Sequence, residues 1–500
     1  MNHREYDVLI IGGGITGAGT ARDCARRGLS VLLVEKADFC NGATGRNHGL
    51  LHSGARYAVT DPVSARECIE ENRILRRIAP HCVDPTDGFF VTLPEDDITY
   101  VHKLVQACRA AGIGAEQVDT GRALEMEPSL NPDITAAVKV PDASVDPFRL
   151  TLSNVLDAEM HGAETLIWHE AVSLVTEGGR VLGARLRDVR TGEEKEVRAA
   201  VTVNASGIWG QAIAAMAGTQ IRMLAAKGAL LVFGHRVNRM VVNRCRKPSD
   251  GDIIVPGEVV CVAGTTSSKV PFEEVDNLRV TPEEAALLLR ESSALMPSLR
   301  ATRVIRAYAG VRPLVAADDD PTGRKTSRGI VCLDHAVRDG IEGLVSITGG
   351  KMMTYRRMAE EAADVVCAKL GNTAKCDTAS ALLPLVEAVE EQRTKGEPLI
   401  CECEEIDRAG VRHAVETLGA RSLGELRRRT RLGMGTCQGQ LCAYRAARIL
   451  HGDDAEAMQD DLRRFLSERW KGMRPIAWGD TLAEAQFTAY IYQNLLGLRK

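Results

Sequence analysis

The feature that most constrains this chain is a glycine-rich turn that directly follows its first apolar segment. Residues 6–11 (YDVLII) have the length of a strand, and Gly12, Gly14 and Gly17 follow at the spacing G-x-G-x-x-G. Small and apolar residues then recur at helical spacing, so the pattern predicts a strand, a tight turn and a helix. Glycines at such a turn let backbone N–H groups approach a pyrophosphate at the helix N-terminus, where the helix dipole favours anions.

A second predicted strand, residues 30–34, ends at Glu35. A carboxylate at this place can accept hydrogen bonds from a ribose 2′-OH and disfavours a 2′-phosphate. Strand, helix and acid occur in the order of a dinucleotide-binding fold, so we predict a bound dinucleotide, with Ile15, Thr16 and Lys36 among its contacts. The alternative is a glycine-rich turn that binds nothing.

A polar loop punctuated by glycines (residues 38–57) stands where an ordinary NAD-binding domain would continue with a strand. Such a loop can wrap a flat polar ring system with backbone contacts, which favours FAD over a nicotinamide dinucleotide. His48 and His52 lie in this loop, and the alternative for each is that it only hydrogen-bonds the loop. The cofactor contacts predicted here are Thr44, Arg46, Asn47, Gly49, Leu50 and Leu51.

Three later segments contribute further predicted cofactor contacts. Small residues close a predicted strand at 200–204, and Val172 stands where another strand could pass the adenine. A predicted strand at 344–348 runs into Gly-Gly-Lys and a helix to about residue 370, so a helix dipole and a lysine point to one place. The contacts predicted in these segments are Val172, Ala205, Ser206, Gly207, Gly349, Gly350, Lys351 and Met352.

Residues 303–314 (RVIRAYAGVRPL) place three arginines close together in a segment that reads as a strand. One alternative is a basic face exposed to solvent. Arg312, flanked by Gly310 and Pro313, is the arginine that we expect to point inward.

Composition limits the remaining possibilities. A chain of 500 residues suggests two to four domains, and a net charge of −4 gives no argument for binding nucleic acid or an anionic membrane. No uncharged apolar stretch reaches about 18 residues, so we expect no membrane-spanning helix. The N-terminus passes directly into a strand and does not look like a signal peptide, so the fourteen cysteines are interpreted as thiols or metal ligands.

Four of these cysteines form a pattern near the C-terminus. Cys401 and Cys403 are spaced C-x-C, and Cys437 and Cys442 are spaced C-x4-C after an arginine-rich segment with nearby glycines. Four thiolates at such spacings are typical of metal sites, and the tight first pair favours an iron–sulfur cluster over zinc, which usually takes C-x2-C or wider pairs. Zinc and plain unligated cysteines remain the alternatives.

Residues 1–370 resemble the FAD-dependent glycerol-3-phosphate dehydrogenases of the D-amino-acid-oxidase structural class. The matching stretches are GGGITGAG, ATGRNHGLLHSGARY, AGVRPL and TGGKMMTYR, and the last three are much more specific than the glycine fingerprint. The cysteine module is similar to the bacterioferritin-associated-ferredoxin-like [2Fe–2S] domain. Together with RCRKPSD (244–250) and ERWKGMRPIAWGD (468–480), the two modules resemble the catalytic large (A) subunits of the anaerobic members of the family.

The resemblance implies a fold and a division of the chain. We expect an α/β fold with a Rossmann-like FAD-binding domain, a β-rich substrate domain and a small helical iron–sulfur domain. The flavin domain would span residues 1–370, with FAD-binding parts at about 1–85, 145–220 and 330–370 and substrate parts at about 86–144 and 221–329. A linker would follow at 371–400, then the cluster domain at 401–455 and a tail at 456–500 that covers the core or docks a partner.

The resemblance also implies chemistry: oxidation of sn-glycerol 3-phosphate at C2 to dihydroxyacetone phosphate, with a hydride passing to flavin N5. Arg312 and Arg56 are the predicted phosphate ligands, because planar guanidinium groups bind phosphate in a bidentate manner. Tyr57 is predicted to contact substrate, His52 to act as the base, and Lys351 to stabilise the anionic reduced flavin. Aerobic relatives carry a histidine where this chain has Ala229-Leu230, so a role for that histidine is not carried over.

Electrons are expected to leave through the cluster to flavoprotein and iron–sulfur membrane-anchor subunits, and then to quinone. This places the chain in the cytoplasm, peripheral on the inner face of the cytoplasmic membrane. The bacterioferritin-associated ferredoxin closes its cysteine module with C-x2-C, whereas this chain has C-x4-C. The spacing therefore leaves the type of cluster open. Competing interpretations are a flavin dehydrogenase of an amine, amino acid or other hydroxy acid, and a flavin-binding redox sensor without enzymatic activity.

Overall fold

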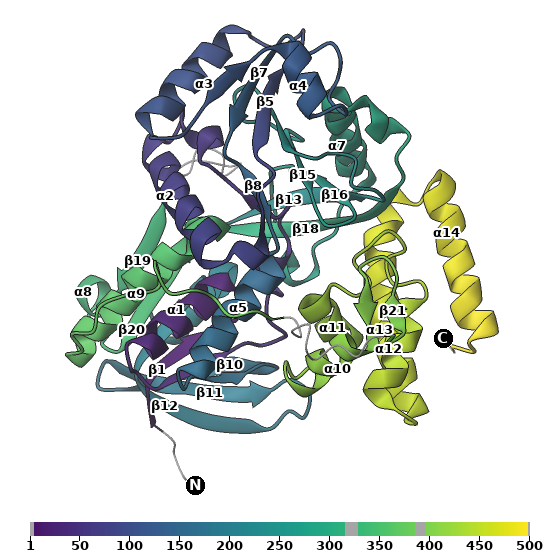
Figure 1. The fold of residues 1–500 in the computed structure, drawn as a ribbon. Helices are drawn as coiled ribbons and strands as arrows, with labels where there is room; N and C mark the ends of the chain where they lie inside the picture. The colour runs from purple at the N-terminus through teal and green to yellow at the C-terminus, as the bar shows by residue number, and fades with distance from the viewer. Residues whose placement is uncertain (1–4, 316–328, 387–395, 499–500) are drawn as a thin grey trace.

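The computed structural model describes residues 5–315, 329–386 and 396–498. Within these residues, eight strands form a sheet at the lower left of Figure 1 and nine others form a second sheet above it. The first sheet runs in the spatial order β10 (His169–Glu177), β11 (Arg180–Asp188), β12 (Glu194–Asn204), β1 (Glu5–Ile11), β2 (Val31–Val34) and β9 (Glu164–Leu166), with β20 (Leu344–Gly349) beside β12 and β19 (Ile330–Asp334) beside β20.

The centre of the first sheet is parallel, which brings several strand ends to one edge. β1 pairs in parallel with β2 and β12, and Ile11 lies opposite both Val34 and Asn204. β20 also runs parallel to β12. Residues that follow these strands therefore meet at one carboxyl edge, where open α/β sheets bind their ligands.

Helix α1 (Ile15–Arg26) packs against this sheet together with α5 (Pro147–Met160) and α9 (Tyr355–Leu370). Small residues on α1 make close packing possible: a Cβ at Gly19 would come within 2.8 Å of the Tyr355 ring. The helix that the sequence predicts after Gly349-Gly350 is confirmed, but a 3₁₀ turn, Met352–Thr354, precedes the α-helix proper.

The second sheet is mainly antiparallel and is built from two separate parts of the chain. Its strands are β17 (Ser268–Lys269), β13 (Met223–Phe233), β16 (Cys261–Gly264), β15 (Ile253–Pro256), β14 (Val241–Arg244), β5 (Gly88–Thr92), β7 (Ala136–Val140) and β6 (Glu116–Val118), with β18 (Val304–Val315) on β13. Helices α2 (Pro62–Ile78), α3 (Thr99–Ala110), α4 (Thr120–Met126) and α7 (Pro282–Leu295) lie in the same upper part of the molecule (Figure 1). The long β13–β18 pair runs from this sheet toward the first one, so it can carry residues into the space between them.

A helical unit forms the C-terminal part of the chain. It contains β21 (Leu399–Cys401), β22 (Ile406–Asp407), α10 (Arg408–Glu416), α11 (Leu423–Thr430), α12 (Cys442–His451), α13 (Ala455–Met473) and α14 (Gly479–Tyr490). Leu462, Phe465 and Tyr492 share one core with Cys401 and Cys442. One face of the predicted tail therefore covers the core of the cysteine module.

The expected α/β fold with an added helical domain is confirmed. The acidic part of the predicted linker, residues 387–391, overlaps the segment outside the described residues. None of the helices in the described ranges is both long and apolar enough to cross a bilayer.

Buried ionic contacts join the helical unit to the part of the chain that carries the two large sheets. Asp38 is fully buried and accepts hydrogen bonds at 3.0 Å from both Nη atoms of Arg429 on α11. Arg428 adds a contact of 3.2 Å to the same carboxylate. Nearby, Arg431 bridges Asp146 of the flavin domain and Glu404 of the helical unit, each at 2.8 Å. These contacts fix the helical unit against the loop that follows Glu35.

We expect Asp38→Ala to destabilise the docked arrangement by about 3–5 kcal/mol, because it leaves buried guanidinium charge without its partner. Urea denaturation measures this loss. Asp276→Ala is the matched control, since Asp276 is 66% exposed in its ion pair with Lys36 and should cost about 1 kcal/mol or less. Equal losses in the two variants would contradict a structural role for the buried pair.

Candidate active site

The glycine-rich turn lies at the carboxyl edge of β1 and begins the ligand cavity. Gly12 has φ +119°, and a Cβ there would come within 2.6 Å of the Ala205 carbonyl oxygen. A Cβ at Gly17 would overlap the Gly12 oxygen. These two positions therefore need glycine for the turn itself, whereas Gly14 has φ −77° and borders the cavity.

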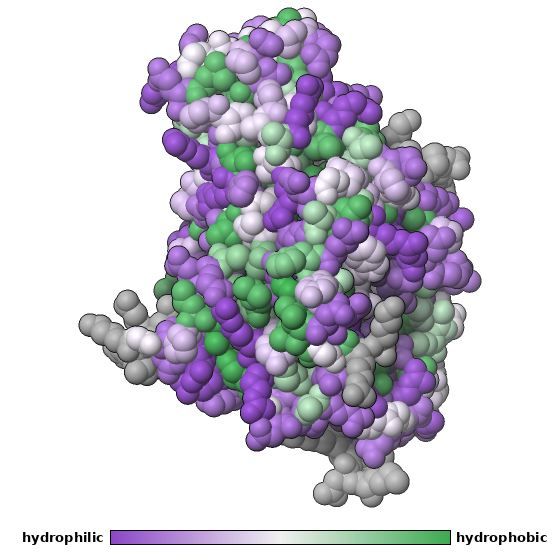
Figure 2. Space-filling view, turned by 90° about the vertical axis from the view of Figure 1, so that its right-hand side faces the viewer, coloured by the Kyte–Doolittle hydropathy of each residue, from purple (hydrophilic) through white to green (hydrophobic). Residues whose placement is uncertain are grey.

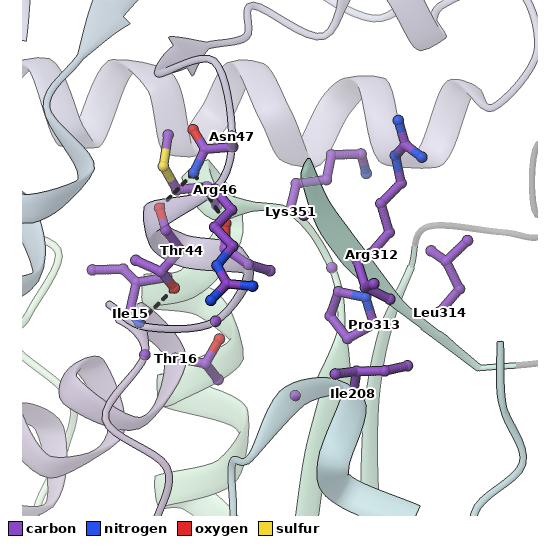
Figure 3. Close-up of a pocket in the computed structure, with 18 of the residues that line it drawn as sticks. Ile15, Thr16, Thr44, Arg46, Asn47, Ile208, Arg312, Pro313, Leu314 and Lys351 are labelled. Atoms are coloured by element: carbon purple, nitrogen blue, oxygen red, sulfur yellow. Dashed lines mark hydrogen bonds between the residues drawn. The ribbon is translucent and has the colours of Figure 1, made fainter. Parts of the chain in front are cut away.

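Thr44 ties the polar loop to this turn. Its Oγ1 accepts a hydrogen bond of 3.0 Å from the backbone N–H of Ile15, the first residue of α1 (Figure 3). The Asn47 amide in turn donates to the Thr44 carbonyl at 2.6 Å. The loop is thus folded over the helix N-terminus and forms a wall of the cavity.

Glu35 sits at the end of β2, as the sequence predicts for a ribose ligand. Its two carboxylate oxygens accept hydrogen bonds from the backbone N–H groups of Gly13 at 2.7 Å and Ala37 at 3.0 Å. Desolvation raises the pKa of this carboxyl, and the two N–H groups oppose that shift. Each oxygen keeps a further lone pair, so the group can still accept a ribose hydroxyl.

The cavity has a volume of about 1030 Å³ and extends from this turn to β18 and β20. Most of the predicted contacts line it: Gly12, Gly14, Ile15, Thr16, Glu35, Lys36, Thr44, Arg46, Asn47, Leu50, His52, Arg56, Tyr57, Ala205, Ser206, Gly207, Arg312, Gly349, Gly350, Lys351 and Met352. Gly17, Gly49, Leu51 and Val172 are not among its lining residues, although Ala171 is. The glycine cradle and an elongated, mixed polar and apolar cavity fit a dinucleotide.

Arg312 points inward from β18, and the structure surrounds it with hydroxyl and carbonyl oxygens. Its Nη2 donates to Thr265 Oγ1 at 2.6 Å and to the Thr266 carbonyl at 3.0 Å. Its Nη1 lies 3.4 Å from Ser267 Oγ. In Figure 3, the Arg312 and Lys351 side chains extend toward the same end of the cavity.

Arg56 lies in a different environment. Its Nη2 forms an ion pair of 3.0 Å with the fully buried Asp252 and also contacts the Ser249 carbonyl. Its Nη1 is buried and makes no hydrogen bond within the described residues. Arg56 therefore lines the cavity with its charge already partly balanced by Asp252.

Lys351 and His52 gather around Tyr57. The Lys351 Nζ lies 4.8 Å from the centre of the Tyr57 ring, within the range of a cation–π interaction. The His52 ring lies 5.5 Å from the same ring and is mostly buried. The glycine-lysine turn, the loop histidine and the tyrosine thus meet at one end of the cavity.

Several lining residues are not predicted as contacts from the sequence. They are His48, Trp209, Thr265, Ser267 and Pro313. Among these, the sequence indicates His48 as a loop residue and Pro313 only as a neighbour of Arg312. Thr265 and Ser267 reach Arg312 only through pairing of distant strands, so no local pattern could have indicated them.

The four predicted cysteine ligands come together in the helical unit. Cys442 is hydrogen-bonded to Cys401 and Cys437, and Cys403 is hydrogen-bonded to Cys437. The bond from Cys442 lowers the pKa of Cys437 to about 5 and that of Cys401 to about 7. The same bonds raise the pKa of Cys442, and burial raises the pKa of Cys403 to about 11. Four thiols gathered in one place fit ligation of a small cluster, whose ligands are thiolates.

Backbone shape supports the same site. A Cβ at Gly435 would come within 2.4 Å of Cys403 Cβ, so a side chain there would displace a predicted ligand. The four thiols are not arranged around a single ion position. In the described part of the chain, no three His, Cys, Asp or Glu side chains surround one such position. The ten other cysteines of this chain are free and mostly buried.

Comparison with known families defines the class. A model described as FAD dependent oxidoreductase matches residues 7–356, and one described as BFD-like [2Fe-2S] binding domain matches residues 399–451. The chain therefore belongs to the FAD-dependent oxidoreductase family and carries a [2Fe–2S] domain. Its cofactors are FAD and a [2Fe–2S] cluster, as the sequence predicts.

Similar individual proteins narrow the class further. The A-subunit of anaerobic glycerol-3-phosphate dehydrogenase from Escherichia coli is 54% identical over 99% of this chain and 98% of its own length. The protein of that name from Haemophilus influenzae is 52% identical over 100% of this chain and 94% of its own length. The glycerol-3-phosphate dehydrogenase of Bacillus halodurans, solved with FAD, has a TM-score of 0.60 at 24% identity over 100% of this chain and 88% of that one.

We expect Gly14→Val to fold but to lose FAD. The backbone at Gly14 suits any residue, and an added Cβ approaches only Thr44 Oγ1, at 3.1 Å, yet a valine would occupy the approach of the pyrophosphate. Flavin absorbance after gel filtration measures the loss. Gly114→Val, where a Cβ meets nothing within 4 Å, is the control that should retain FAD. Stoichiometric FAD in folded Gly14→Val protein would contradict this placement.

Protein purified without oxygen should contain about two irons and two acid-labile sulfides per chain. Cys437→Ser should lose both, because one thiolate ligand is removed. Cys376→Ser, which changes a cysteine outside the module, should keep both. Bound zinc with no labile sulfide would refute the cluster.

Proposed function

We propose that this chain oxidises sn-glycerol 3-phosphate at C2 to dihydroxyacetone phosphate. The observation that carries the proposal is the meeting of Arg312, Lys351, His52 and Tyr57 at one end of the dinucleotide cavity. When bound, FAD supplies the hydride acceptor. The residues of the chain must then bind the phosphate, orient C2 and receive the hydroxyl proton.

Phosphate recognition is assigned to Arg312. Its guanidinium lies among the Thr265 and Ser267 hydroxyls, and such groups can donate to phosphate oxygens alongside the guanidinium. Arg56 is the second predicted phosphate ligand. Its pairing with Asp252 leaves it less free charge, so we assign it a supporting role.

His52 is the proposed base for the C2 hydroxyl. It borders the cavity from the loop that also carries Tyr57, and the Tyr57 ring packs against it edge to face. Its main chain is held by Asn72, whose amide donates to the His52 carbonyl at 3.2 Å. A base held in this way can accept the proton at a fixed position while Tyr57 bounds the substrate.

Lys351 is proposed to favour negative charge on the bound flavin. It precedes the 3₁₀ turn Met352–Thr354, which leads into α9, so its ammonium group and the first N–H groups of the turn contribute charge of the same sign. The Tyr57 ring helps to hold the ammonium group in place.

Electron exit is assigned to the cysteine module. Cys403 and Cys437 line a surface depression together with Arg303, Thr436 and Phe487. Figure 2 views the molecule from the side of the helical unit and shows apolar side chains among hydrophilic ones. Exposed aromatic residues on and near α14 include Trp478, Phe487 and Tyr490. This surface suits a partner protein that approaches the cluster closely.

The relatives carry the name of one lettered subunit, which supports association of this chain with further subunits. We propose that the partners are a flavoprotein and an iron–sulfur membrane-anchor subunit that pass electrons to quinone. The chain would then lie in the cytoplasm, peripheral on the inner face of the membrane. Proteins with the cluster removed should still show flavin reduction by substrate but should pass electrons slowly to the natural acceptor.

Arg312→Ala should lower kcat/KM for glycerol 3-phosphate by roughly two to three decades. Loss of one partner of a buried charged pair costs about 3–5 kcal/mol, and each decade corresponds to about 1.4 kcal/mol. Activity on glycerol, which has no phosphate, is the control and should hardly change. Equal losses on both substrates would show that Arg312 serves the fold or the flavin instead.

Lys351→Met should lower the flavin reduction potential by tens of millivolts and weaken sulfite binding. A charge at about 4 Å and an effective dielectric near 20 contributes up to about 4 kcal/mol, and screening reduces this. About 30 mV corresponds to 1.4 kcal/mol for a two-electron couple. Lys369→Met, on α9 but paired with Asp334, is the matched control. An unchanged potential in Lys351→Met with full FAD content would assign Lys351 to the surface.

A further inference from the structure

A second cavity, of about 1140 Å³, lies between the flavin domain and the helical unit. Its walls include parts of β18, α11 and α13 and residues 41–49 of the polar loop, together with several other segments of the chain. Asn41, Arg46, Asn47 and His48 line both cavities, so this loop separates the second cavity from the flavin site. None of the chemistry assigned above uses this space.

The walls of this cavity carry more basic than acidic side chains. Ten arginines and one lysine line it against six carboxylates, although the whole chain has a net charge of −4. Three of these arginines, Arg190, Arg428 and Arg431, are paired with carboxylates that do not line the cavity. Several of the carboxylates are already paired: Asp146 with Arg431, Glu258 with Arg149, and others likewise. A cavity of this charge in an acidic chain suits an anion.

Two half-buried arginines of the cavity lack an ion-pair partner within the described residues. The side chains of Arg306 on β18 and Arg427 on α11 make no hydrogen bond or ion pair within the described residues, and the Arg427 Nε is inaccessible to solvent. Burial lowers the pKa of Arg427, and the charges of Arg306 and Arg428 lower it further. Burial also lowers the pKa of Arg306, although Glu468 opposes this shift. Guanidinium groups held together in this way destabilise the fold unless an anion balances them.

A neutral polar residue borders the same space. Gln438, next to Cys437, is only 3% exposed and its Oε1 makes no hydrogen bond within the described residues. Its Nε2 is committed to the Met434 and Gly435 carbonyls, at 2.8 and 2.9 Å, so the free oxygen is an acceptor. The aromatic rings of Phe148, Tyr308 and Phe465 also line the cavity.

We propose that this cavity binds a phosphorylated ligand of the nucleotide class. Arg306 and Arg427 hold its phosphate, and Gln438 accepts an N–H group of its ring system. The volume exceeds that of the flavin cavity, so the site has room for far more than inorganic phosphate. Guanidinium groups and a buried acceptor together select a phosphate joined to a polar aromatic ring.

The test uses protein loaded with FAD and cluster and washed at high salt to remove anions held by charge. Isothermal titration with AMP should show one site per chain whose affinity falls with salt and is at least about tenfold higher than that for inorganic phosphate. FAD should remain bound throughout. Arg427→Gln should weaken AMP binding by about tenfold or more, which is the range for a lost charge-assisted hydrogen bond. Arg185→Gln, an exposed arginine on β11, is the matched control and should bind AMP normally.

Thermal unfolding gives a second measurement, because the substitution should affect the unfolding temperature differently with and without AMP. Without AMP, Arg427→Gln should unfold at the same or a higher temperature than the unchanged protein, because it relieves repulsion. With saturating AMP, the unchanged protein should gain more stability than the variant. Four outcomes would each overturn the proposal: no AMP binding, binding of inorganic phosphate only, displacement of FAD by AMP, or equal AMP affinity in Arg427→Gln.

Discussion

The buried contact between Asp38 and the arginines of α11 is the interaction on which the arrangement of the two redox modules depends. Asp38 follows closely after Glu35, whose carboxylate holds the backbone of the glycine turn. One short segment is therefore fixed to the nucleotide turn at one end and to the helical unit at the other. The position of the cysteines relative to the flavin cavity follows from this double attachment.

The loop after Asp38 is also attached to two separate parts of the structure. Thr44 fixes it to the first turn of α1, and Tyr308 of β18 donates a hydrogen bond of 2.7 Å to the Asn47 carbonyl. β18 then continues to Arg312, so the proposed phosphate ligand is tied mechanically to the wall of the flavin cavity. The loop, α1 and β18 are thereby joined into one preorganised site. Few side chains need to move in such a site when substrate binds.

Features that depend on neighbouring residues could be predicted from the sequence, and features that depend on distant pairing could not. The glycine turn, Glu35 and the cysteine pairs each carry their signal within a few residues. The partner of Arg56, Asp252, and the hydroxyls around Arg312 come from other strands, so no local pattern indicates them. Val172 shows a related effect: the β10–β11 register shifts between Ala171 and Ser173, and Ala171 lines the cavity whereas Val172 does not. The second cavity is likewise assembled from many separate parts of the chain.

The central claim is that this flavin site oxidises glycerol 3-phosphate, and anaerobic titration of the purified protein tests it most directly. Adding glycerol 3-phosphate without an acceptor should bleach the oxidised flavin absorbance at a stoichiometry of one per chain. Proline and 2-hydroxyglutarate, which represent amino-acid and hydroxy-acid dehydrogenases, should leave the spectrum unchanged. Bleaching by either of these compounds, with none by glycerol 3-phosphate, would contradict the account.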